Sequence, residues 1–73
     1  MKPQESIQRA VTEFTQATEK YQPFNSPHEG FAVLKEEVDE LWDLVKQDAS
    51  KRELAAEAKQ VAAMALRFLT DCC

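Results

Sequence analysis

Residues 31–45 read FAVLKEEVDELWDLV, and the architecture of the chain follows from the helical pattern of this stretch. Its apolar residues recur every three to four positions, as on one face of an α-helix. Ser26, Pro27 and Glu29 form a helix start, with a capping serine, a proline at the first position and a capping box. We therefore expect a helix from about Pro27 to Gln47. Its main buried stripe should consist of Phe31, Leu34, Val38, Leu41, Trp42 and Val45.

A group of glutamates lies on the other side of the same helix. Glu36, Glu37 and Glu40 fall within about one turn and have no basic residue three or four positions away. Like charges at this spacing weaken a helix. Val33 and Leu44 flank the group, so we expect a second helix to cover it partly. Carboxylate oxygens are the preferred ligands of hard cations, and the group is therefore a candidate Mg²⁺ site.

Two further helices are expected, from Gln4 to Tyr21 and from Lys51 to Thr70. The second of these begins with a capping box formed by Ser50 and Glu53. One face of this helix is apolar and should be buried: Leu54, Ala58, Val61, Ala65, Phe68 and Leu69. Along one edge of it runs a mixed series: Glu53, Glu57, Gln60, Met64, Arg67 and Asp71.

The chain of 73 residues, with a single glycine, is expected to be one all-α domain spanning residues 1–73. The short connection between the second and third helices predicts an antiparallel hairpin. Folding back in this way brings the segments 36–40 and 57–60 to similar heights along the axis of the hairpin. Small domains often gain stability by association, so two chains should pair through their second apolar faces into a helical bundle.

Composition excludes several classes of function. A formal net charge of −4 disfavours binding of polymeric nucleic acid through its phosphates. The longest apolar run, residues 61–66, is far shorter than the ~18 residues of a membrane span, and no signal pattern opens the chain. The adjacent Cys72 and Cys73 cannot staple a fold and are expected to be reduced thiols of a cytoplasmic protein. Nucleophilic triads and glycine-rich phosphate loops are absent.

The acidic residues of the two helices resemble the signature of the MazG-like all-α nucleotide pyrophosphohydrolases. That signature is Glu-Glu-x-x-Glu followed on the next helix by Glu-x-x-Asp. Glu36, Glu37 and Glu40 match its first half, and Glu57 to Gln60 occupy the second half after an interval of sixteen residues. The sequences at residues 28–34 and 60–65 are also similar to small members of the family, so the resemblance covers roughly residues 24–71.

The resemblance implies Mg²⁺-dependent hydrolysis of nucleoside triphosphates, often deoxynucleotides, to the monophosphate and pyrophosphate. It also implies a homodimer or a dimer of dimers. The metal ligands would be Glu36, Glu37, Glu40 and Glu57, together with the amide oxygen of Gln60. Glu37 or Glu40 would orient or deprotonate the attacking water as the catalytic residue.

Gln60 departs from the family pattern, which has Asp at this position. An uncharged amide should weaken a second metal site or leave a single ion, unless Glu53, one turn before Glu57, supplies the missing carboxylate. Three alternatives stay open: a solvated acidic surface without a ligand, a catalytically inactive helical interaction module, and a coiled-coil adaptor. The basic residues nearest the second motif are expected to be ordinary surface charges or salt-bridge partners, with phosphate contact as the less favoured alternative for each: Lys51, Arg52, Lys59 and Arg67.

Overall fold

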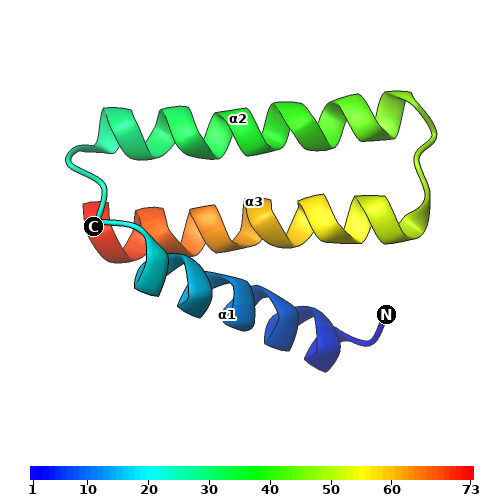
Figure 1. Ribbon diagram of the computed structural model, residues 1–73, viewed down its shortest axis with the longest axis horizontal. Helices are drawn as coiled ribbons and strands as arrows, with labels where there is room; N and C mark the ends of the chain where they lie inside the picture. The colour runs from blue at the N-terminus through cyan, green and yellow to red at the C-terminus, as the bar shows by residue number, and fades with distance from the viewer.

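The chain folds into three α-helices and contains no strands (Figure 1). In this computed structural model, which describes residues 1–73, the helices are α1 (Pro3–Lys20), α2 (Pro27–Lys46) and α3 (Lys51–Cys72). The predicted all-α class is confirmed, and each helix begins and ends within two residues of its expected boundary. None of the three helices has the combination of length and apolarity needed to cross a bilayer.

Side-chain caps explain where α2 and α3 begin. The Ser26 hydroxyl accepts the Glu29 N–H at 3.1 Å, and the Ser50 hydroxyl accepts the Glu53 N–H at 3.2 Å. The Glu53 carboxylate in turn accepts a hydrogen bond from the Ser50 N–H at 3.1 Å, which confirms the predicted capping box. The box predicted at Ser26 is wrong in its second half, because the Glu29 carboxylate accepts the backbone and amide N–H groups of Asn25 instead.

A tight turn at residues 47–50 joins α2 to α3. Asp48 has a φ of 52°, a left-handed conformation that the short polar side chain of Asp tolerates. The Ala49 N–H donates to the Leu44 carbonyl at 3.0 Å and so satisfies an acceptor in the last turn of α2. The turn places α3 alongside α2 (Figure 1).

α3 is the central helix of the fold. It packs against both α1 and α2, whereas α1 and α2 do not pack against each other (Figure 1). Residues of α3 that face the junction of the three helices are therefore covered from two directions. This arrangement positions the candidate site described below.

The interior of a single chain is small. Gly30 of α2 is buried where α2 meets α3, and a Cβ there would lie 2.9 Å from a ring carbon of Phe68 and 3.0 Å from one of Phe24. The absence of a side chain at Gly30 thus allows the Phe24 ring to pack directly on α2. The Cys72 thiol packs against the core and donates to the Ser26 carbonyl at 3.7 Å. The buried apolar residues are Ala17, Phe24, Ala63 and Met64.

The side of α2 expected to form the main buried stripe is mostly exposed, so this expectation is wrong for the single chain. Only Leu34 and Leu41 of the six residues are partly buried. α2 has two apolar sides, but the fold supplies only α3 as a neighbouring helix, and α3 covers the side that carries Glu37. The remaining four residues, called here the outer stripe, are Phe31, Val38, Trp42 and Val45.

The predicted orientation of α3 is wrong in a related way. Ala58, Ala65 and Leu69 were expected to be buried but are exposed. Met64 and Arg67 of the mixed edge are instead among the most buried residues of the chain. The cause is α1, which packs on α3 from the side opposite α2 and turns this edge toward the three-helix junction.

Candidate metal centre and adjoining groove

Three glutamates from two helices meet between α2 and α3. Glu37 and Glu40 lie one turn apart on α2, and Glu57 faces them from α3. Each offers a carboxylate oxygen, and these oxygens lie within 4.8 Å of one another. The expectation that the acidic segments of the two helices lie at similar heights holds for these residues. They are called here the carboxylate cluster.

Burial within the cluster is uneven. Glu40 is exposed, Glu37 is partly buried, and Glu57 is partly buried with one oxygen, Oε2, removed from solvent. No donor of the protein forms a hydrogen bond with this oxygen. A buried acceptor without a partner costs free energy of about 1–3 kcal/mol. Glu57 is therefore the member of the cluster whose surroundings are least compatible with an ionised carboxylate alone.

The electrostatics of Glu57 reflect this environment. Burial of its carboxyl group is the largest cause of a pKa raised from 4.5 to about 8, followed by the hydrogen-bonding and charge interactions with Glu37 and then by Glu40. At neutral pH, Glu57 therefore favours its protonated form in the protein alone. A bound divalent cation would reverse the balance, because positive charge favours ionised carboxylates.

The donor set suits a hard cation. Mg²⁺ binds carboxylate oxygens and commonly completes its coordination with waters and substrate phosphates rather than with an all-protein cage. The carboxylate cluster offers three such groups, and the buried Glu57 oxygen has no hydrogen-bond donor other than the neighbouring carboxyl groups when these are protonated. The residues present therefore fit a magnesium ion.

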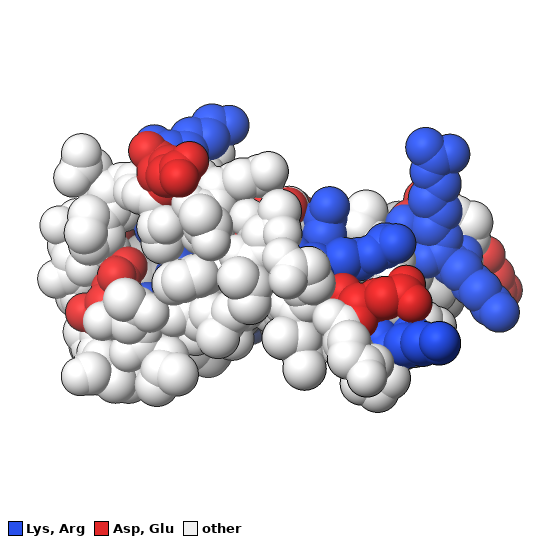
Figure 2. Space-filling view, turned by 90° about the horizontal axis from the view of Figure 1, so that it is seen from below, with Lys and Arg blue, Asp and Glu red and all other residues white.

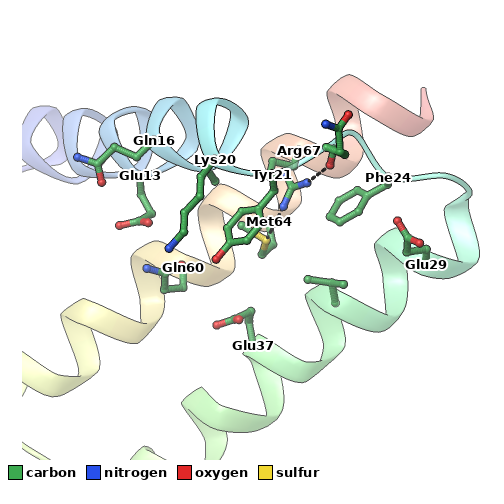
Figure 3. Close-up of a pocket in the computed structure, with 13 residues that line it drawn as sticks. Glu13, Gln16, Lys20, Tyr21, Phe24, Glu29, Glu37, Gln60, Met64 and Arg67 are labelled. Carbon is green, nitrogen blue, oxygen red and sulfur yellow. Dashed lines mark hydrogen bonds between the residues drawn. The ribbon is translucent and has the colours of Figure 1, made fainter.

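Three other residues considered from the sequence lie in different settings. Glu36 is exposed and outside the carboxylate cluster. Gln60 is partly buried one turn after Glu57, and it lines the same groove as Glu37 (Figure 3). Glu53 does not supply the missing carboxylate, because its side chain is held by the capping box at Ser50.

A groove of about 610 Å³ adjoins the cluster, and all three helices line it (Figure 3). α2 contributes Glu37, α3 contributes Gln60 and Arg67, and α1 contributes Gln16 and Lys20. A volume of this size is within the range of small-molecule sites. The groove thus connects a candidate metal centre with space for an organic ligand.

Aromatic and cationic side chains lie together at the groove. The guanidinium carbon of Arg67 is 4.2 Å from the Phe24 ring centroid and 5.7 Å from that of Tyr21. The Lys20 ammonium is 5.3 Å from the same Tyr21 ring. Sequence reasoning ranked a surface charge or a salt bridge above phosphate contact for Arg67 and so missed its burial at the groove. The available signal was its place on the mixed edge of α3 that also carries Glu57.

No family model, curated protein or solved structure matches this chain.

Proposed function

We propose that this protein is a Mg²⁺-dependent nucleoside triphosphate pyrophosphohydrolase that clears nucleotides from the cytoplasmic pool. The observation that carries the proposal is the buried, unpartnered oxygen of Glu57 among the carboxylates of Glu37 and Glu40. Three carboxyl groups gather there from two helices although no cation of the chain pairs with them. The adjoining groove supplies the space for a nucleotide.

The chemistry divides between the ion and the chain. Bound Mg²⁺ would offset the charge of the phosphates and increase the acidity of water. Glu40 and Glu57 would hold the ion, while Glu37, which faces the groove, would orient the attacking water and accept its proton. Hydrolysis between the α and β phosphates consumes one water and gives the monophosphate and pyrophosphate. Gln60, on the same groove as Glu37, would offer an amide oxygen and adds no charge, which favours one ion over two.

The proposed assembly is a homodimer or a dimer of dimers, in which antiparallel hairpins of α2 and α3 associate into a bundle. The outer stripe supports it, because Phe31 is 58% exposed and Trp42 57% exposed in the single chain. Leu69 of α3 is also exposed. Large apolar side chains grouped on one side of a small domain favour association with another protein surface. A second copy would bury them.

A catalytically inactive interaction module is the second candidate. Gln60 favours it, because the resemblance would place an acidic ligand at this position. In that case the outer stripe would still mediate association, but nucleotides would not be hydrolysed.

The deciding experiment measures pyrophosphate release from a panel of ribo- and deoxynucleoside triphosphates, with Mg²⁺ and with chelator. Metal-dependent release that Glu40→Gln abolishes is the expected result. Asp39→Asn is the matched control, because Asp39 is exposed on the same helix and pairs with Lys35 at 2.8 Å. No release from any nucleotide by a folded, associated protein would favour the inactive module.

A further inference from the structure

Arg67 is a buried cation without a carboxylate partner. Arg67 is only 5% exposed, and none of the ion pairs of the chain includes it. One terminal nitrogen donates to the Gln22 carbonyl at 2.9 Å, and the other approaches the Met64 sulfur, a weak acceptor, at 3.7 Å. Since a guanidinium carries five N–H donors, much of its bonding capacity is unused.

The surroundings hold this guanidinium in place but do not neutralise it. Phe24 lies against it at 4.2 Å, and the Phe24 backbone N–H is itself fixed by the Asp71 carboxylate at 3.0 Å. This hydrogen bond uses one carboxylate oxygen of Asp71, the acidic residue one turn beyond Arg67. A buried charge is costly unless it is paired. The site is therefore prepared for an anion that comes from outside the chain.

The groove provides the path to Arg67. Arg67 and Glu37 line the same cavity, and Figure 3 shows them on different walls, with Tyr21 and Met64 between them. Tyr21, which is 54% exposed, lies beside the guanidinium at the groove. A ligand that spans the groove would thus meet carboxylates on one wall and a cation on the other.

Lys20 is the one exposed cation that lines the groove beside Arg67. Figure 2 shows most of the Lys and Arg of the viewed face toward the end at which α1 begins, and a smaller basic group near the other end; Figure 1 shows that the α2–α3 turn also lies at the end where α1 begins. Arg52, in the first turn of α3, lies at that end, whereas Arg67 lies toward the opposite end of the same helix. General surface attraction of anions would therefore act mainly at the other end of the molecule, and at the groove through Lys20.

We propose that Arg67 binds a phosphate group of the nucleotide. Its planar fork of donors matches two phosphate oxygens, which a lysine ammonium cannot reproduce. The assignment of that phosphate to a nucleotide rests on the proposed function, whereas phosphate binding at Arg67 rests on the unpaired guanidinium and the groove. Arg67 is thus a ligand-binding residue opposite the carboxylate cluster.

The test is a titration with inorganic pyrophosphate and with a deoxynucleoside monophosphate, in chelator, followed through the arginine Nε–H signals in ¹H–¹⁵N spectra. The other arginines of the chain, Arg9 and Arg52, are exposed and act as internal controls. The Arg67 signal should shift and saturate while the other two move little. No shift at Arg67, or equal non-saturating shifts at all the arginines, would overturn the proposal.

Two substitutions sharpen the result. Arg67→Lys should weaken binding roughly tenfold or more because it loses the bidentate geometry, whereas Arg52→Lys should leave it unchanged. Thermal melting of each variant checks the fold, and the wild-type titration decides the question even if Arg67→Lys unfolds. Arg67-dependent binding without pyrophosphate release would retain this inference and reject the proposed function. Release with an unmoved Arg67 signal would retain the function and reject the inference.

Discussion

The two sides of α2 distribute polarity in opposite ways. The side toward α3 partly buries Glu37 against Glu57, while the outer stripe leaves Phe31 and Trp42 in solvent. Stability of a single chain alone would favour the reverse, because buried carboxylates and exposed aromatic rings are both unfavourable. The difference supports the two proposals made above, a cation bound at the inner side and another protein surface bound at the outer side.

Of the substitutions considered, replacing Glu57 should reduce metal-dependent activity the most. Glu57→Gln removes the carboxylate with the buried, unpartnered oxygen, so pyrophosphate release with Mg²⁺ should fall by roughly 100-fold or more, beyond the effect typical of residues that only support a ligand. Steady-state kinetics over a range of Mg²⁺ concentrations measures this, with Asp39→Asn as control. Activity within a few-fold of wild type would place the metal elsewhere.

Replacing Trp42 tests the outer side. Trp42→Glu puts a charge into the stripe and should weaken self-association by about 2–4 kcal/mol, the range of a central aromatic interface residue. Sedimentation velocity at several protein concentrations measures the change. Lys35→Gln, at an exposed position of α2 outside the stripe, is the control. An unchanged sedimentation profile in Trp42→Glu would show that the stripe does not mediate association.

The pKa of Glu57 makes metal-free stability depend on pH. Its pKa rises from 4.5 to about 8 on folding, so the folded protein keeps a proton that the unfolded chain loses between these values. The free energy of unfolding should be greatest below pH 4.5 for this group and fall by about 1–2 kcal/mol toward pH 8, after allowance for solvent screening.

Urea unfolding in chelator, compared between wild type and Glu57→Gln, isolates this contribution because the other titrating groups are common to both. The variant should lose the decline and be the more stable protein at pH 8. Saturating Mg²⁺ should also flatten the wild-type curve. Parallel pH profiles for the two proteins would contradict the assigned pKa.

Glu36 should give the smallest effect. Its carboxylate is exposed and outside the carboxylate cluster, so Glu36→Gln should change the apparent Mg²⁺ affinity by no more than about threefold, as for a screened surface charge. The measurement is pyrophosphate release as a function of Mg²⁺ concentration. A loss comparable to that of Glu57→Gln would mean that Glu36 enters the cluster when the ion binds.

The helices and the meeting of their acidic segments were predictable because their signals are local. Ser50 and Glu53 define a capping box in four residues, and the matched heights of residues 36–40 and 57–60 follow from a short turn. The same box also excludes Glu53 as a metal ligand. That conflict was already present in the sequence, since one carboxylate cannot cap Ser50 and reach toward Glu57.

Helix rotation and the burial of Arg67 were not predictable, because both depend on contacts between distant segments. α2 carries two apolar sides, and periodicity does not say which one α3 covers. Arg67 is covered by the connection between α1 and α2, where Gln22 and Phe24 contact its guanidinium across more than forty residues of sequence. No local pattern encodes such a contact.

The protonated Glu57 has a consequence for how the site fills. With a pKa of about 8, the metal-free site already holds a hydrogen ion at neutral pH. Under the proposed function, Mg²⁺ enters by displacing it, so loading is an exchange of one cation for another and releases acid. Apparent affinity for the metal should then fall by up to about tenfold for each unit of acidification below pH 8. The pH of the solution would thus set the fraction of the protein that has Mg²⁺ bound.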